Sequence, residues 1–471
     1  MIKRLAVLLL RMTGAPDLPT KNYAEQLFTN AGRGTRNLVD YYDEMSHGQI
    51  DLGPSKVFDW VDYGHTNQDL MDVWTKARDE KLKEGLAAGL GKKEAEDQAN
   101  VYANGVRRAK IKEWGRDAAA VNQYDLTGFD VVVYVFNQPV DYFGSPDGVV
   151  LNWDPSNGNT AFTIDLTGVA HEVGHGLGLN HSRRVGSTAE YGDLWDIMSA
   201  YTVYRDTSGT NTPPGSKYFT FGPGLNAVNM DLVGWLDPTR VFTATGSAFF
   251  KLRPLHRRDL SGWLAAELQV HGQTYSIEYR AKEAWDAAIP AHCVLVHRRG
   301  THPGDGRPCS EIFVAQPALV TGPRADLREG ESFEDGDKLN ISSEYVSITV
   351  QSIDARNHEA TVSVVVRQRR RIDQVGLVLG GVDVDGGGHL WTPGRGIVRI
   401  PPRSPVLRAI EHLAEYATLE TVAAGRDAVA IEHLALGRLI AARDALSAMI
   451  EARKAPAVPG PVQHPSTHQA P

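Results

Sequence analysis

The first half of the chain is organised by two continuous apolar runs and by several stretches of helical periodicity. Leu5 to Leu10 are apolar without interruption, and Phe129 to Asn137 form a second run that is rich in valine. Such runs are typical of strands buried on both faces of a sheet. Residues 68–118 are instead charge-rich, with apolar positions at helical spacing and a break near Gly91, so they predict a helical insert. Further helices are expected around residues 23–28 and 35–48, and shorter strands at 148–154 and 160–164.

The pattern changes after residue 238. From about Thr239 to Val366 the chain has short β-rich runs such as "TYSIEYR", "CVLVH" and "YVSITV", divided by Gly, Pro and Asp. Regularly spaced short strands of this kind indicate a β-sandwich. We therefore expect an α/β (α+β) domain over residues 1–238, a β-sandwich over 239–370, a Gly-rich linker and α-helical hairpin over 371–455, and a disordered tail over 456–471.

The length, the net charge and the apolar runs of the chain exclude some classes of protein. A chain of 471 residues has room for about three globular units. Its net charge of −8 does not favour a nucleic-acid partner. No stretch reaches the roughly 18 apolar residues of a membrane span. The apolar run Leu5–Leu10 follows Lys3 and Arg4 as in a signal peptide, but it is short and has no cleavage site, so we expect a cytoplasmic protein as encoded.

The segment "HEVGHGLGLNHS", residues 171–182, concentrates the candidate chemistry. His171 and His175 are four apart, so on a helix both rings project from one face. Glu172 lies between them, where it can reach a water held on a metal. Gly178 can take a positive φ and turn the chain, which returns His181 as a third ligand. Three neutral imidazoles leave zinc an open fourth position, at Zn–N distances of about 2.0–2.1 Å.

A chance origin is the alternative explanation of this segment. With 16 His and 46 Gly in the chain, the full pattern arises by chance roughly once in ten thousand such chains. The apolar residues Val169, Val173 and Leu177 also repeat at helical spacing, which gives the expected helix a face toward the core. We therefore interpret the segment as a site for one catalytic Zn²⁺.

These residues resemble a known family. The pattern HExxHxxGxxH is the signature of metzincin metallopeptidases, and "HEVGHGLGLNHS" is most similar to the matrixin form. "WDIMSAYT" supplies the methionine turn of those enzymes at Met198. "YYDEMSHGQIDL", "GWLDPTRV" and "YSIEYRAKEAWDAAIPAHCVLVHR" resemble the immune inhibitor A family and its gametolysin-like relatives. The resemblance covers residues 36–298 and implies a zincin fold.

The resemblance also implies an activity. The chain would be a zinc-dependent endopeptidase that hydrolyses peptide bonds of a protein or peptide substrate through a zinc-activated water, with Glu172 as general base. Gly178 and Met198 would be structural, the methionine forming an apolar floor beneath the ligands. Tyr201 or Tyr204 would stabilise the transition state. Relatives are often secreted, in contrast to the expectation from the N-terminus.

Two positions depart from the family patterns. Immune inhibitor A proteins have an acidic third ligand where this chain has His181, and Asp193 is the nearest acidic alternative. The tyrosine of the astacin-like pattern lies two residues after the methionine, whereas Tyr201 lies three after it. We therefore favour a packed turn residue for Tyr201 over a catalytic one.

Other functions and sites are compatible with parts of the sequence. The chain would alternatively be a non-catalytic zinc-stabilised binding protein, or a hydrolase of non-peptide amides; a pure binding protein has no need of Glu172. "DVDGGG", from Asp383, resembles half of a Ca²⁺ loop, but a turn explains it better. Cys293 and His297 share a strand face and would suit a second metal, although strand packing is the preferred explanation. Cys293 and Cys309 would pair if the protein is exported. The oligomeric state is not indicated.

Overall fold

The structure is a computed structural model that describes residues 1–14, 17, 19–152, 165–207, 220–315, 324–336 and 344–367. It also describes the backbone of three short strands, β17 (Asp383–Val384), β18 (His389–Thr392) and β19 (Gly396–Arg399), which form an antiparallel sheet. This sheet replaces part of the expected Gly-rich linker. The strand expected at 160–164, the helical hairpin and the tail at 456–471 lie outside the described residues.

The N-terminal sheet is built around the first apolar run. Its strand order is β2 (Lys56–Val57), β1 (Leu5–Arg11), β4 (Val131–Phe136), β6 (Gly148–Asn152) and β5 (Phe143–Ser145), with β3 (Val61–Asp62) also paired to β1. All pairs are parallel except β5 with β6. Leu5, Val7 and Leu9 enter one core, and Ala6, Leu8 and Leu10 enter another. The strand is therefore buried on both faces, as its unbroken apolar run predicts.

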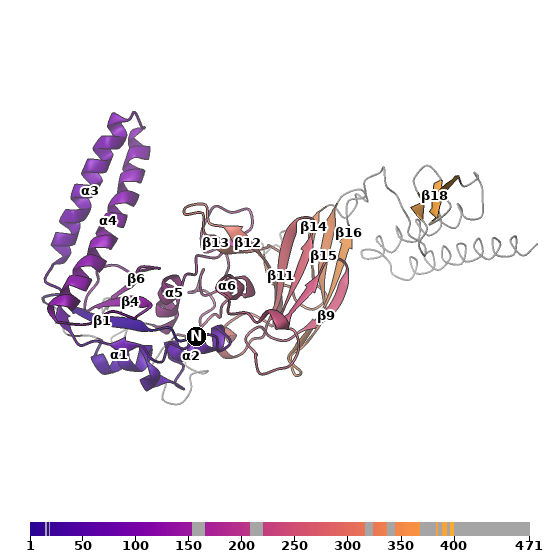
Figure 1. Cartoon of the computed structure of the whole chain (residues 1–471), viewed down its shortest axis with the longest axis horizontal. Helices are drawn as coiled ribbons and strands as arrows, with labels where there is room; N and C mark the ends of the chain where they lie inside the picture. The colour runs from indigo at the N-terminus through magenta and orange to yellow at the C-terminus, as the bar shows by residue number, and fades with distance from the viewer. Residues whose placement is uncertain are drawn as a thin grey trace, which may run out of the picture. The chain divides into compact units, whose positions relative to one another are not determined.

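Helices cover both faces of this sheet. α1 (Lys21–Phe28), α2 (Leu38–Met45) and α5 (Leu166–Gly176) share the core of Leu5, whereas α4 (Lys92–Val121) packs into the core of Leu8. α3 (Asn67–Ala87) and α4 lie side by side and extend away from the sheet (Figure 1). Gly91 separates the two helices at the predicted break.

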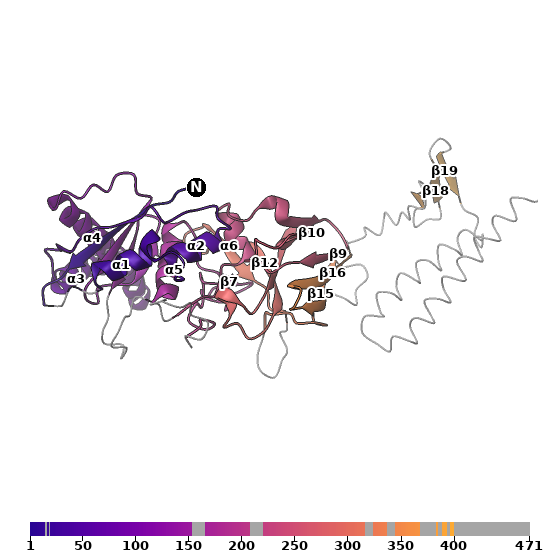
Figure 2. The same cartoon turned by 90° about the horizontal axis from the view of Figure 1, so that it is seen from below.

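The β-rich region forms two sheets. One has the order β7 (Arg183–Arg184), β13 (Pro308–Ile312), β12 (Cys293–Thr301), β11 (Gln273–Arg280), β10 (Ala265–Val270) and β8 (Val241–Ala244). The other has the order β14 (Ser332–Gly336), β15 (Tyr345–Asp354), β16 (Glu359–Arg367) and β9 (Ala248–Leu252). The two sheets lie next to each other in Figure 2. Side chains of both sheets, among them Ile277, Ile348 and Val362, share one core.

The boundary expected at residue 238 does not divide the structure. Residues Met1–Asp335 and Val346–Val366 form one compact unit. β7 follows the histidine motif directly, yet it pairs with β13 in the six-stranded sheet. Leu255, Leu264 and Trp285 come after the boundary but belong to the core that contains α5. The metal-site motif and the β-sheets are therefore connected by both strand pairing and apolar packing.

The cysteines do not form the disulfide considered for an exported protein. Both are free and buried. Cys293 begins β12, whereas Cys309 lies opposite Gly300 near the far end of the same strand. Seven residues at about 3.3 Å each put roughly 20 Å between them, and a disulfide requires Cα atoms within about 7 Å. That prediction is wrong for this fold.

Within the described residues, no helix combines the length and apolar character needed to cross a bilayer.

Candidate metal centre

Helix α5 carries the first two histidines. Its N-terminus is capped by Asp165, whose carboxylate accepts a hydrogen bond from the Gly168 N–H at 2.8 Å. At the other end, Gly178 has φ +102°, and the Leu179 N–H reaches back to the carbonyl of Gly174. This is a Schellman-type ending, in which glycine relieves the strain of a left-handed turn. The turn lets the chain reverse, so that His181 faces the helix.

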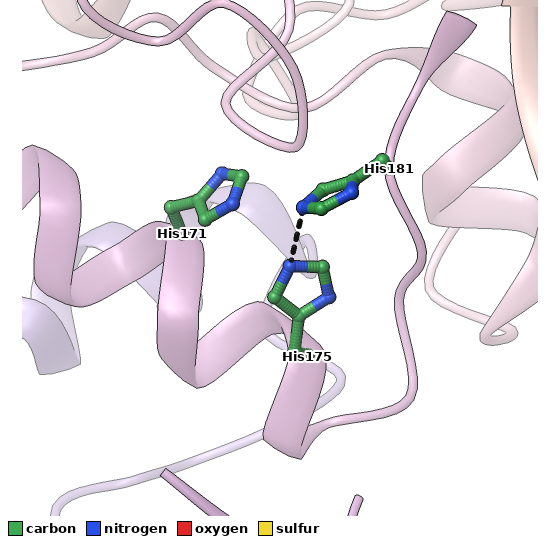
Figure 3. A group of neighbouring side chains, drawn as sticks. All are labelled: His171, His175 and His181. Atoms are coloured by element: carbon green, nitrogen blue, oxygen red, sulfur yellow. Dashed lines mark hydrogen bonds between the residues drawn. The ribbon is translucent and has the colours of Figure 1, made fainter. Parts of the chain in front are cut away.

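The three histidines converge on one point (Figure 3). One ring nitrogen from each of His171, His175 and His181 lies within 4.8 Å of the other two. The Nε2 atoms of His175 and His181 are 3.0 Å apart. Two nitrogens that bind one tetrahedral zinc are separated by roughly 3.3 Å. This is the only group of three or more potential ligand residues in the described part of the chain, and it is the predicted set.

Hydrogen bonds at Nδ1 set the orientation of every ring. His171 Nδ1 donates to the carbonyl of Ile197 at 2.7 Å, and His175 Nδ1 donates to that of Leu179 at 2.9 Å. His181 Nδ1 lies 3.0 Å from a carboxylate oxygen of Glu190. A neutral imidazole that donates through Nδ1 carries its lone pair on Nε2. Each ring is thus prepared to bind a metal through Nε2, in the manner of histidine ligands with outer-shell partners.

Burial keeps these rings neutral. It lowers the pKa of His171 to about 3 and that of His175 to about 4, and the neighbouring histidines act in the same direction. Burial also lowers the pKa of His181, against the opposing effect of Glu190. Zinc binds the neutral form of imidazole. The donor atoms, their protonation and their convergence therefore fit a zinc ion.

Glu172 follows His171 on α5 and is not one of the grouped ligands. Its side chain is buried, with the residue 7 % exposed. Burial raises the pKa of its carboxyl to about 8, and a hydrogen bond from the backbone N–H of Gly144 opposes this shift. A cation between the histidines would also favour the ionised carboxylate. The charge of Glu172 acts on Tyr191 and Tyr201, whose rings lie 4.4 Å from that of His181 and 4.7 Å from that of His171. The carboxylate is therefore near the histidines and outside the ligand group.

No protein-family model, curated protein or solved structure matches this chain.

Met198 lies beneath the helix at the predicted turn. It is fully buried, and a methyl group at Gly174 would come within 2.4 Å of its sulfur. The glycine therefore allows the close approach of helix and methionine. The carbonyl of Met198 accepts a hydrogen bond from the Ser182 N–H at 2.8 Å, so the turn also holds the residue next to His181.

The tyrosines are placed differently from one another. The half-buried Tyr201 ring lies 4.7 Å from that of His171, and it packs against the core that contains α5. Tyr204 instead packs on Trp195 at 5.2 Å, in a separate cluster with Leu295 and Ile312. Tyr201 therefore borders the metal centre as a packed residue, whereas Tyr204 belongs to a different apolar cluster.

Sequence reasoning missed Tyr191 and Glu190. The Tyr191 ring lies 4.4 Å from that of His181, and its backbone has φ +63°. Glu190 contacts the same histidine and also bonds His302 at 2.8 Å. Neither residue belongs to a recognisable motif. An isolated bridge between Arg183 and Glu190 brings them to the site, and that contact has no local signal in the sequence.

The other metal candidates within the described residues do not form a site. Asp193, the acidic alternative to His181, is fully buried and contacts His297 Nε2 at 2.9 Å. Cys293 lies in the apolar cluster of Trp195. Strand packing, the preferred explanation of Cys293 and His297, agrees with these positions. Asp383 is described by its backbone alone, and the rest of the DVDGGG loop lies outside the described residues.

Proposed function

We propose that this protein is a zinc-dependent endopeptidase with a zincin-type catalytic site. The observation that carries the proposal is the arrangement of His171, His175 and His181, whose Nε2 atoms face one point while every Nδ1 is occupied. Glu172, which follows His171 on α5, adds a buried carboxylate that is not one of the grouped ligands. Zinc, general base and an open ligand position together are the requirements of metal-assisted hydrolysis.

The residues divide the chemistry between them. A zinc ion held by the three histidines would polarise the scissile carbonyl and increase the acidity of water. Glu172 accepts the proton of the attacking water and later delivers it to the leaving amine. Burial raises the pKa of this carboxyl to about 8 in the metal-free site. A bound cation would favour the ionised form, which is the form that accepts a proton. Met198 and the Nδ1 acceptors keep the rings in place.

A peptide substrate is supported by the position of β5. Among the described strands of its sheet, β5 (Phe143–Ser145) has a neighbour on one side only. It also packs against α5, and its Gly144 N–H bonds Glu172. An exposed strand edge offers backbone donors and acceptors to an extended peptide. A peptide paired with β5 would lie beside the general base, which favours peptide bonds over other amides as the substrate.

Substitution of Glu172 tests this proposal. Glu172→Ala and Glu172→Gln should retain about one zinc per chain but lose cleavage of casein and of a mixed peptide library by roughly 10²–10⁴-fold or more. Glu44→Gln is the matched control, because Glu44 is also a partly buried glutamate whose pKa is raised by burial, and it bonds Trp285. The control should cleave at the wild-type rate.

The alternatives give different results in the same assay. A zinc-stabilised binding protein would hold zinc in all variants and cleave no peptide even as wild type. A hydrolase of other amides would leave peptides intact but hydrolyse small acylated amines in a Glu172-dependent manner. Cleavage that persists in Glu172→Ala at the wild-type rate would contradict the proposed general base.

A further inference from the structure

The turn between β12 and β13 reaches the third histidine through Glu190. One carboxylate oxygen of Glu190 lies 3.0 Å from His181 Nδ1, and the other lies 2.8 Å from His302 Nε2. His302 directly follows the last residue of β12, Thr301. His302 Nδ1 lies 3.2 Å from the backbone nitrogen of Gly304 and 3.2 Å from a carboxylate oxygen of Asp305. A carboxylate can only accept, so His302 Nε2 is the donor to Glu190.

The same turn also holds the backbone of His181. The His181 N–H donates to the side-chain oxygen of Asn180 at 3.0 Å. The amide nitrogen of Asn180 in turn donates to the carboxylate of Asp305, at 3.3 and 3.4 Å. Asp305 is fixed by the backbone and side chain of Arg307 at 3.0 and 2.7 Å. Two chains of contacts therefore run from the turn to His181, and they meet where Asp305 lies 3.2 Å from His302 Nδ1.

His181 needs this support more than the other two histidines do. His171 and His175 are held by a helix and by carbonyl groups from Ile197 and Leu179, which are nearby in the fold. His181 lies in the loop after Gly178, where no helix fixes its backbone. Its side chain is also more exposed than theirs, at 17 %.

We propose that the β12–β13 turn is a positioning element for the metal centre, in which His302 orients the ring of His181 through Glu190 and Asp305 orients its backbone through Asn180. The inference rests on the proposed function only in taking His181 as a zinc ligand. Outer-shell partners of this kind fix the tautomer and direction of a ligand and raise its basicity. The metal affinity of the α/β region therefore depends on side chains supplied by the β-sheet region.

Metal binding by His302 variants tests the proposal. His302→Ala removes the donor to Glu190, whereas in His302→Gln the amide N–H can replace it. We expect the zinc dissociation constant to rise about 10–100-fold in His302→Ala and to stay within a few-fold of wild type in His302→Gln. His292→Ala is the matched control, because His292 immediately precedes the same strand at its opposite end. It should leave zinc affinity unchanged.

Cobalt substitution separates positioning from general destabilisation. The visible absorption of the Co²⁺-loaded protein reports ligand geometry, so its bands should change in His302→Ala and be restored in His302→Gln. Both variants should keep the circular dichroism of wild type. If His302→Ala binds zinc as tightly as wild type with an unchanged cobalt spectrum, the positioning role is overturned and the zinc site stands. If wild type itself binds neither metal, the zinc site fails and the positioning role fails with it.

Discussion

The molecule contains two sites with buried histidine side chains, and the two sites differ in the groups that surround the imidazole rings. His171, His175 and His181 face one another across a point that contains no carboxylate. His297 is also fully buried, but it lies 2.9 Å from a carboxylate oxygen of Asp193 and 3.8 Å from one of Glu278. Glu278 in turn contacts the buried Arg280.

The neighbours shift the pKa values in opposite directions. Burial lowers the pKa of His171 to about 3 and of His175 to about 4, and the hydrogen bonds to the carbonyls of Ile197 and Leu179 oppose this only in part. Burial alone would also lower the pKa of His297, but the carboxylates of Glu278 and Asp193 outweigh it and raise the value. The first group is therefore neutral at physiological pH, and the second is stabilised as a cation.

This difference distinguishes a ligand from a structural histidine. A metal ligand must be neutral and must present a lone pair on Nε2, which an acceptor at Nδ1 favours. That acceptor is a carbonyl for His171 and His175 and the Glu190 carboxylate for His181. A histidine between carboxylates uses its protons to balance buried charge. The bonding partners of the two ring nitrogens therefore carry more information about function than burial does.

The largest predicted effect separates the groups by metal content. His175→Ala should reduce zinc from about one per chain to near zero at micromolar concentrations, because two histidines form an incomplete site. His297→Ala should keep about one zinc per chain at pH 7.5. Native mass spectrometry measures both. Loss of zinc from His297→Ala, in protein shown to be folded, would mean that the two groups are not independent.

The second effect concerns stability. His297→Ala leaves Asp193 buried without its cationic partner, and breaking a buried pair costs about 3–5 kcal/mol. Urea denaturation of the zinc-loaded protein should show this loss in the free energy of unfolding. His292→Ala, from the same end of β12 as Cys293, is the comparison and should change stability by less than about 1 kcal/mol. Equal losses in the two variants would contradict a special role of the His297 group.

The third effect is a pair of pH dependences with opposite sign. The folded pKa values of His171 and His175 lie below the ordinary value of 6.5, so the metal-free protein should lose stability as pH falls from about 6.5 toward 4 and 3. The folded pKa of His297 is raised, so its contribution is present below 6.5 and is lost as pH rises through the folded value. The free energy of unfolding of metal-free His297→Ala, measured by denaturation at several pH values, should still fall as pH decreases below about 6.5. It should no longer show the loss that His297 causes as pH rises.

The smallest effect concerns the turn that returns His181. Gly178→Ala meets no neighbouring atom but forces a side chain into φ +102°, which should cost about 1–2 kcal/mol. Gly91→Ala is the matched control, because Gly91 is also in open space but has φ −60°. It should be nearly neutral. If the two variants lower the melting temperature by the same amount, backbone strain at residue 178 is not the cause of the effect.

Local patterns predicted the elements that depend on local physics. The run Leu5–Leu10 predicted a strand buried on two faces. The spacing of His171, His175, Gly178 and His181 predicted a helix, a turn and three rings that converge. Each of these follows from the period of a helix or strand, or from the freedom of glycine at positive φ.

Features that depend on distant contacts were not predictable in this way. Glu190 and His302 meet where β7 pairs with β13, two strands that are far apart in the sequence, and neither residue lies in a motif. The failed Cys293–Cys309 bridge has the same cause: proximity in sequence suggested a short loop, but an extended strand separates the two residues. The apolar packing that continues across residue 238 was not predictable either, because the composition changes at that position.

Anomalous diffraction at the zinc edge, from crystals of the zinc-loaded protein, tests the central claim most directly. We predict one peak, at about 2.0–2.1 Å from the Nε2 atoms of His171, His175 and His181, and none beside His297. Glu172 should lie outside bonding distance of that peak. A peak coordinated by Asp193 or Glu172, a peak beside His297, or no peak at the three histidines in zinc-saturated crystals would contradict the account.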